Sequence, residues 1–394
     1  MNLHLQLALR YLYSKSGGSF SSNASILAII GLSIGLFSLI LTLSIIKGFE
    51  NVLDEKLSNI DGKVRVKSIL GNPIIMQEKL DSLLSNIDFP LDIVPYIRGA
   101  AMVRLGGSTD GIIIEGVDKI PDQNYFDLRS KIISKNDIII GKVLADEMGI
   151  SAGDEIIITP LDNSKNHLYN QKFNLMKVIG FIDTGMQEYD KTIAYTSLDM
   201  ARDIFNMDSA VSGFIINGSD QIKNITNVLS DHIRYPYYYE TWRDRHQIIF
   251  NWIKTQRIPI VIIFSLIALV AITNIMAAVS MIIREKNSQI GVLISLGMDY
   301  STIRKIFYYY GAIIGFLGCI LGSGCSFIFI LVQNKYKIIR LSEDIYFMDY
   351  VPANFDSMVF CIILVLTLII SVISTIIPSR SIIRQSPAEL LLQE

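Results

Sequence analysis

The sequence predicts a membrane protein with four transmembrane α-helices and a large extracytoplasmic α+β domain. The chain of 394 residues is 51% hydrophobic and only 18% charged, which is unusual for a soluble protein of this size. It contains four uncharged runs, each longer than the roughly 20 residues that a helix needs to cross a bilayer. One long hydrophilic segment separates the first run from the second. The four runs are 16–46, 258–283, 306–334 and 357–379.

The first run is predicted to be a retained transmembrane helix, 23–48, preceded by an amphipathic N-terminal segment, 1–22. Arg10 and Lys15 precede it, as basic residues precede the apolar part of a secretory signal. However, the apolar stretch is too long for a signal peptide, and it continues to Lys47 without a small-residue cleavage site.

The distribution of Lys and Arg predicts the orientation of the chain. Four spans place the N-terminus, the loop 284–305 and the C-terminal tail on one side, and these regions together hold eight basic residues. The loop 334–356 on the other side holds three. Basic residues accumulate on the cytoplasmic side, so both termini are predicted to be cytoplasmic. The remaining predicted segments are transmembrane helices 258–283, 306–333 and 357–378, a periplasmic loop 334–356 and a cytoplasmic tail 379–394.

Charge and cysteine usage narrow the class of function. The segment 50–257 has 23 Lys and Arg against 29 Asp and Glu, a net charge of −6, whereas the rest of the chain carries +4. An acidic outer domain argues against a nucleic-acid partner. All three cysteines fall inside predicted spans, so no disulfide framework is expected and they are interpreted as small packing residues.

The predicted outer domain, 49–257, contains the same sequence of secondary-structure elements in two places. Alternating or helical spacing of apolar residues identifies each element. Strand, helix and strand are predicted first at 62–69, 74–87 and 94–105, and again at 211–218, 219–233 and 237–242. Two strand–helix–strand halves are therefore expected to pack together, with an inserted, mostly β module at about 106–205.

Within this module, 137–160 is predicted to form a strand, a short helix and a second strand. Gly149 is expected to cap the helix, and Gly153 to lie in the following turn. The polar run 160–171 then leads to a strand at 173–182. Its length exceeds that of most hairpin loops, so it is either an ordinary surface loop or a protruding functional loop.

The sequence lacks the motifs of a catalyst. Gly141-Lys142 is followed by Val143, which breaks the phosphate-binding loop pattern. The four histidines lack metal-ligand spacing, no serine lies in a nucleophile elbow, and no thiol lies outside the predicted spans. We therefore expect no catalytic residue, no metal site and no cofactor in this chain, and a partner must supply energy for any work.

The loop 284–305 is the only predicted cytoplasmic loop between spans. It begins with Arg284, Glu285 and Lys286, and apolar positions with helical spacing predict a short helix that ends at a glycine. A helix of about nine residues is marginal in isolation, so it needs a surface. It either lies flat on the lipid interface or docks on a soluble ATPase as a coupling helix. The predicted docking face consists of Ile290, Leu293, Ile294 and Gly297.

Seven segments of the chain, in order, resemble a known family. The sequence is similar over nearly its full length to the lipoprotein-releasing permeases of the LolC/LolE family, which belong to the MacB/FtsX type of ABC-transporter membrane subunits. One difference is Lys47, where family members commonly carry Asn. The segments are LALRYLYSKSGGSFSS (7–22), LILTLSIIKGFE (39–50), GMQEYDKTIAYTSLDMARDIF (185–205), TWRDRHQ (241–247), IIREKNSQIGVLISLGM (282–298), EDIYFMDYVPANF (343–355) and PSRSIIRQSPAELL (378–391).

The resemblance implies an ATP-driven complex in the bacterial inner membrane. This chain would pair with a second LolC/LolE-type permease or a second copy of itself, and with two copies of a LolD-like cytoplasmic ATPase that bind ATP and Mg²⁺. The complex would extract triacylated lipoproteins from the membrane lipids and pass them to a periplasmic LolA-like carrier. Each buried CH₂ contributes about 0.8 kcal/mol, so three acyl chains do not leave a bilayer unaided.

The resemblance also implies two further sets of site residues. Apolar residues near the outer leaflet are expected to line a lipoprotein cavity, although lipid-facing or packing roles remain open for each: Leu41, Ile45, Phe49, Ile253 and Val261. If the chain is the carrier-binding permease of its pair, Pro160 stiffens the base of the polar loop, and Leu168 and Tyr169 anchor the carrier.

Three other functions fit parts of this pattern. A MacB-like efflux permease and an FtsX-like regulator of cell-wall hydrolases share the membrane arrangement. A membrane scaffold without transport activity shares the large outer domain. A scaffold is expected to leave the turnover of a co-purified ATPase unchanged, whereas a transporter subunit is expected to change it.

Overall fold

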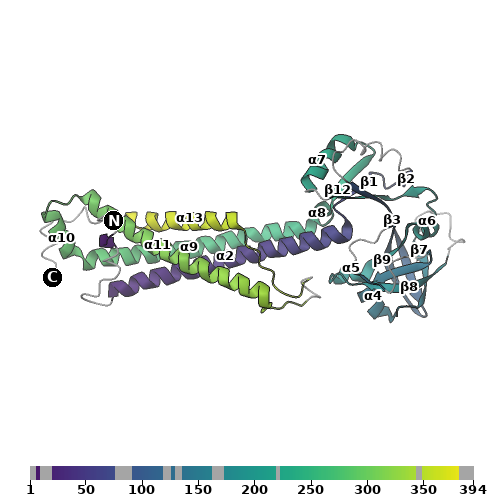
Figure 1. The fold of residues 1–394 in the computed structure, drawn as a ribbon, viewed down its shortest axis with the longest axis horizontal. Helices are drawn as coiled ribbons and strands as arrows, with labels where there is room; N and C mark the ends of the chain where they lie inside the picture. The colour runs from purple at the N-terminus through teal and green to yellow at the C-terminus, as the bar shows by residue number, and fades with distance from the viewer. Residues whose placement is uncertain are drawn as a thin grey trace. The chain divides into compact units, whose positions relative to one another are not determined.

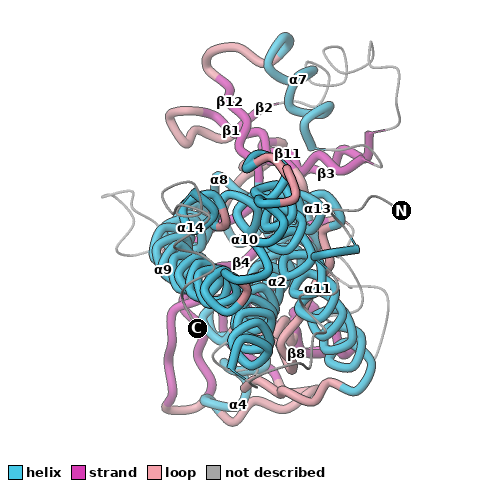
Figure 2. The backbone as a smooth tube through the Cα atoms, turned by 90° about the vertical axis from the view of Figure 1, so that its left-hand side faces the viewer, coloured by secondary structure: helices cyan, strands magenta, loops and turns pink. Residues whose placement is uncertain are grey.

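The chain divides into two compact units, shown in Figures 1 and 2. The membrane unit comprises Met1–Glu50, Trp252–Ile339 and Val351–Glu394, and the outer unit comprises Asn51–Asn251 and Arg340–Tyr350. The computed structural model describes residues 6–8, 20–75, 91–118, 126–128, 135–161, 173–218, 222–342 and 348–380.

Long apolar helices build the membrane unit. Among the described residues, four helices are long and apolar enough to cross a membrane, which confirms the predicted fold class. They lie side by side in both views (Figures 1 and 2), and the short helix α10, Asn287–Ser295, connects the second to the third. The four are α2 (Phe20–Asp61), α9 (Gln247–Glu285), α11 (Tyr300–Tyr336) and α13 (Ser357–Ser374), which is followed by α14 (Ile376–Arg380).

Glycines on α11 allow this helix to approach two neighbours closely. An added Cβ at Gly311 would lie 2.1 Å from Thr375 Cγ2, and one at Gly322 would lie 2.7 Å from the backbone oxygen of Ser33 on α2. Small residues at such positions let transmembrane helices pack backbone to backbone. α11 therefore packs closely against α2 on one side and against the junction of α13 and α14 on the other.

The helices α2 and α9 extend beyond the uncharged runs that predict the spans. α2 continues to Asp61, and its buried residues Leu53, Leu57 and Ile60 follow helical spacing inside the outer unit. α9 starts at Gln247, well before the first apolar residue of its run. A helix ends where backbone hydrogen bonding ends, and that position need not coincide with a membrane surface.

The two predicted halves of the outer unit pack together in one antiparallel sheet, which agrees with the prediction. The strand order is β12-β1-β11-β3, so β1 of the first half lies between two strands of the second half. The first two residues of the predicted helix 74–87 form strand β2 instead, and the rest of it lies outside the described residues. The elements are β1 (Val64–Ser68), β3 (Leu91–Leu105), β11 (Gly213–Gly218), α7 (Ile222–His232) and β12 (Tyr237–Thr241), with a separate pair β2 (Ile74–Ile75) and β10 (Ala210–Val211).

The predicted mostly β module is a closed ring of six strands. The pairing runs β3-β4-β9-β6-β8-β7 and returns to β3, where Ala101 pairs with Pro160. The start of β3 pairs with β11 and its end with β7, so this one strand joins the ring to the antiparallel part of the same sheet. The further elements are β4 (Ser108–Val117), β5 (Phe126–Leu128), β6 (Asp137–Gly141), α4 (Lys142–Met148), β7 (Glu155–Pro160), β8 (Asn174–Ile182), α5 (Gln187–Thr192), β9 (Ile193–Ser197) and α6 (Leu198–Phe205).

Two glycines of the module adopt the backbone conformation that their predicted roles require. Gly149 caps α4 with φ 68°, and Gly153 has φ 108° in the turn before β7. Both values lie in the left-handed region, which glycine enters without steric cost.

Gly141→Ala is expected to destabilise the module by about 1–3 kcal/mol, because overpacking a rigid backbone contact forces the chain to move. An added Cβ at Gly141 would lie 1.7 Å from the backbone oxygen of Asp190. Gly107→Ala is the matched control, since nothing lies within 4 Å of its added Cβ. Thermal unfolding of the full chain in detergent gives the melting temperature of each variant. Equal melting temperatures for Gly141→Ala and Gly107→Ala would contradict the prediction.

Candidate functional site

The helix α10 has two apolar faces, and only one of them is exposed. Ile290 is 1% exposed and packs in the membrane unit's own core beside Ile282 and Phe307. Ile294 packs against the same core. The predicted docking face therefore lies mainly against the bundle rather than toward a partner.

The exposed apolar residues here are Val292 on α10 and Leu296, which caps its C-terminal end, and neither belongs to the predicted docking face. Their exposed fractions are 47% and 79%. Leu293 is half-buried, and Gly297 follows the helix with φ 91°, so the helix ends where the sequence predicts. Val292 and Leu296 are spaced i, i+4 and form a second apolar stripe. The helical period of the sequence alone is enough to find this stripe.

The charged residues that precede α10 differ in exposure: Arg284 is exposed, whereas Lys286 is buried in an ion pair. Lys286 is 4% exposed, and its Nζ lies 3.2 Å from Oε1 of Glu285. This ion pair lies at the junction of α9 and α10 within the membrane unit. The pair is thus suited to fixing the junction rather than to binding a partner.

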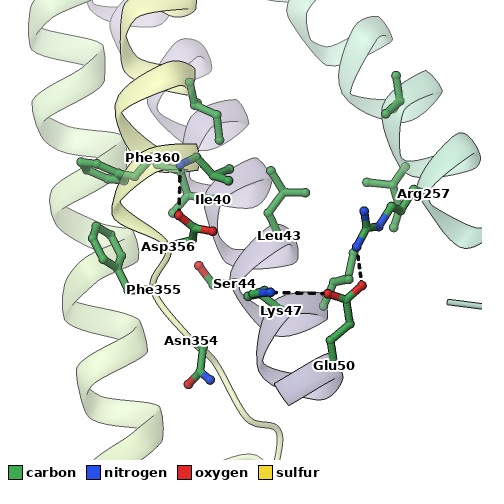
Figure 3. A pocket seen from close by; sticks show the side chains of 15 residues that line it. Ile40, Leu43, Ser44, Lys47, Glu50, Arg257, Asn354, Phe355, Asp356 and Phe360 are labelled. Carbon is green, nitrogen blue, oxygen red and sulfur yellow. Dashed lines mark hydrogen bonds and ion pairs between the residues drawn. The ribbon is translucent and has the colours of Figure 1, made fainter. Parts of the chain in front are cut away.

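A pocket of about 340 Å³ lies among α2, α9 and the start of α13 (Figure 3). Most of its wall is apolar. α2 contributes three aliphatic residues, α9 contributes two, and the chain around the start of α13 adds aromatic rings. These residues are Ile40, Leu43, Ile46, Ile260, Val261, Phe355, Val359, Phe360 and Ile363.

One end of the pocket is charged. Glu50 on α2 accepts a hydrogen bond from Arg257 on α9, and Lys47 Nζ lies 3.8 Å from the same carboxylate. Figure 3 shows both cations directed at Glu50. Asp356 caps α13 by accepting from the backbone N–H of Met358 at 3.0 Å. This charged end connects two helices that are far apart in the sequence.

Of the five residues predicted to line a lipoprotein cavity, only Val261 lines this pocket. Leu41 and Ile45 pack against the apolar core formed around α11 and α13, and Ile253 is buried. Phe49 is half-buried and lies outside the lining. α2 is apolar on all sides, so its sequence gives no indication of which face borders a pocket.

The predicted carrier-binding loop is described only at its base. Pro160 ends β7, whereas Leu168 and Tyr169 lie outside the described residues. On either side of the loop, three apolar side chains outside the predicted anchor set are more than half exposed: Leu161, Phe173 and Leu175.

A buried ionic cluster joins five elements of the outer unit, α2, β1, β3, β4 and α8 (Trp242–Arg245). Arg65 on β1 donates to both carboxylate oxygens of Glu115 on β4, at 2.8 and 2.9 Å, and to Asp61 Oδ1 at 3.1 Å. Arg245 Nε donates to Asp61 Oδ2 at 3.0 Å, and Arg98 Nη1 to Glu115 Oε2 at 3.2 Å. Burial alone would lower the pKa of Arg65, but the adjacent Glu115 and Asp61 carboxylates raise that pKa well above its usual value.

The four long apolar helices and the large outer unit, together with two matching family models, define a class of protein, a membrane permease subunit with a large periplasmic domain. Two family models match the chain, the MacB-like periplasmic core domain over residues 25–227 and the FtsX-like permease C-terminal region over residues 261–387. The first match spans more than half of the chain, and the chain therefore belongs to the family with a MacB-like periplasmic core domain.

Similarity to individual proteins extends over the whole chain. The lipoprotein-releasing system transmembrane protein LolC of Neisseria meningitidis is 26% identical, with 100% of both chains covered. LolC of Xylella fastidiosa is 22% identical over 100% of this chain and 99% of its own length. The related protein LolE of Haemophilus influenzae is 22% identical, with 99% of each chain covered. The resemblance to the LolC/LolE family is thereby confirmed.

Proposed function

We propose that this chain is the membrane subunit of an ATP-driven complex that releases lipoproteins from the bacterial inner membrane. The observation that carries the proposal is full-length similarity to both LolC and LolE, named as transmembrane proteins of a lipoprotein-releasing system. MacB-like efflux and FtsX-like regulation match only the family models.

The exposed stripe of α10, Val292 and Leu296, is the proposed contact with a cytoplasmic, LolD-like ATPase. Two apolar side chains presented together to water are a favourable docking surface. The ATPase, in two copies, binds ATP and Mg²⁺ and moves α9 and α11, the helices that flank α10. The basic residues near α10 favour a cytoplasmic location for this stripe.

The proposed complex contains a second membrane subunit, either a LolC/LolE-type permease or a second copy of this chain. At about 340 Å³, the pocket in one chain has the size of a small-ligand site, and three acyl chains exceed it. The cargo cavity is therefore assigned to the interface between two membrane subunits. One face of α9 exposes apolar residues at helical spacing that suit such an interface: Ile258, Ile262, Leu266 and Leu269.

The proposed site for a LolA-like carrier is the hairpin between β7 and β8. Its support is the cluster of exposed apolar side chains at the base, Leu161, Phe173 and Leu175. Exposed apolar patches of this kind mark protein interaction sites.

Reconstitution tests the proposed function. The full chain, a partner permease, the ATPase and a triacylated lipoprotein are placed in proteoliposomes, with carrier outside. ATP is expected to drive transfer of the lipoprotein to the carrier, and a mixture lacking this chain is the control. Stimulated ATP hydrolysis without transfer would favour an efflux permease, and unchanged hydrolysis would favour a scaffold.

Topology gives a separate prediction, best measured with the three native cysteines replaced by serine. Ser108→Cys places a thiol on the exposed β3–β4 turn, and Ser288→Cys places one on exposed α10. With the outer membrane permeabilised, an impermeant thiol reagent is expected to label only the first variant, and to label both after the inner membrane is opened. The reverse pattern would place α10 in the periplasm and exclude its contact with a cytoplasmic ATPase.

A further inference from the structure

The pocket lies where the uncharged segments of three helices begin or end. Lys47 follows the apolar run of α2, Arg257 precedes that of α9, and Asp356 precedes that of α13. All three residues line the same pocket (Figure 3). Because such runs match the hydrocarbon core, the pocket spans the boundary between acyl chains and headgroups.

Among the described residues that line the pocket, two cations face one carboxylate that is not engaged by backbone N–H groups. Lys47 and Arg257 share the single carboxylate of Glu50. The other carboxylate, Asp356, is engaged by the backbone N–H groups at the start of α13. The side chains of Lys47 and Arg257 remain 46% and 54% exposed, so both have donors for a further anion. Arg is particularly suited to phosphate because its planar fork matches two phosphate oxygens.

The remainder of the pocket suits one hydrocarbon chain. Its polar end leads to a wall of aromatic and aliphatic side chains, including Phe355, Phe360 and Ile363. The volume of about 340 Å³ lies near the lower limit of small-molecule pockets, so it admits one chain and excludes three.

We propose that this pocket binds one membrane phospholipid, with its phosphate on Arg257 and Lys47 and one acyl chain along the apolar wall. Glu50 competes with the phosphate for the two cations. The lipid anchor of a triacylated lipoprotein carries no phosphate, so the cations provide a means of distinguishing the surrounding lipid from cargo. The site therefore goes beyond the proposed transport function and belongs to the single chain.

Binding to the full chain in detergent tests this assignment by native mass spectrometry. The probes are dioctanoyl-phosphatidylglycerol, dioctanoylglycerol and inorganic phosphate. The phospholipid is expected to bind at least about tenfold more tightly than either fragment probe, since only it satisfies both the cations and the apolar wall. Equal binding of dioctanoylglycerol would overturn the phosphate assignment, and equal binding of inorganic phosphate would overturn the lipid assignment.

Substitutions at the ion pair are expected to act in opposite directions. Arg257→Gln removes a phosphate ligand and is expected to weaken phospholipid binding at least about tenfold. Glu50→Gln removes the competing anion and is expected to strengthen it. Lys254→Gln is the matched control, because it removes the same charge from the same helix outside the pocket lining.

A weaker or unchanged affinity in Glu50→Gln would overturn the proposed competition. If Lys254→Gln loses as much phospholipid affinity as Arg257→Gln, the loss reflects the general charge of the helix rather than a phosphate site in the pocket. Arg257→Lys keeps the positive charge and is expected to retain part of the affinity for phospholipid. This partial retention would show that the loss in Arg257→Gln does not come from a failure to fold. The measurement requires neither ATPase nor lipoprotein, so its failure is distinguishable from failure of the proposed transport function.

Discussion

Leu296→Asp is expected to abolish co-purification of the chain with its ATPase. Leu296 is the most exposed apolar residue of the α10 stripe, so a charge is tolerated there in the free subunit. In a docked complex the same charge is buried without a partner, at a cost of several kcal/mol. A cost of about 3 kcal/mol weakens binding roughly a hundredfold. Affinity purification of the tagged chain, followed by measurement of bound ATPase, checks the prediction.

Two further variants show whether the loss of ATPase binding comes from the contact made by Leu296. Leu296→Met keeps the apolar surface and is expected to retain the ATPase. Ile290→Asp places a charge in the core of the membrane unit and is expected to lower the yield of folded protein. If Leu296→Asp retains the ATPase at the normal level, α10 does not dock there and the flat interfacial helix is favoured.

Glu115→Leu is expected to destabilise the outer unit by about 3–5 kcal/mol, because removing one partner of a buried ion pair leaves an uncompensated charge. The side chains of Arg65 and Glu115 are both 0% exposed, and Arg98 donates to the same carboxylate. Thermal unfolding of the full chain in detergent, combined with limited proteolysis of the outer unit, measures the loss.

The same substitution at a surface pair is the control. Glu147 pairs with Lys191 at 2.6 Å, but both side chains are 46% exposed. Glu147→Leu is expected to cost about 0–1 kcal/mol. A double variant, Arg65→Met with Glu115→Leu, is expected to recover most of the stability, because it removes both charges. Equal losses in Glu115→Leu and Glu147→Leu would show that the buried pair contributes no more than a surface pair.

Local patterns predict much of the fold. Alternation in 62–69 and 94–105 identifies β1 and β3, and apolar runs identify the four long helices. The closing contact of the ring, between β3 and β7, does not follow from such patterns. It joins segments that are distant in sequence, and no local periodicity specifies which strand pairs with which.

The site residues follow less directly from the sequence than the elements that carry them. On α10, the spacing of Ile290 and Ile294 identifies a helix face, but the sequence does not show whether that face packs on the bundle or on a partner. On α2, uniform hydrophobicity conceals the helix phase, so the sequence does not indicate that Leu43 and Lys47 line the pocket, and Leu41 and Ile45 stay predictions for a lipoprotein cavity. The Glu50–Arg257 pair connects two helices and is visible only once they lie side by side.

The closed ring of β3-β4-β9-β6-β8-β7 restricts how another protein can recognise the module. Each ring strand pairs on both sides within the ring, so its backbone groups along those stretches are already satisfied by neighbours. A partner that adds a strand requires an unpaired edge, and among the described strands of the large sheet such edges remain at β12, at β5 and at the start of β4, where 108–112 pair only with β3. Recognition of the stretches that pair on both sides must therefore depend on side chains and loops.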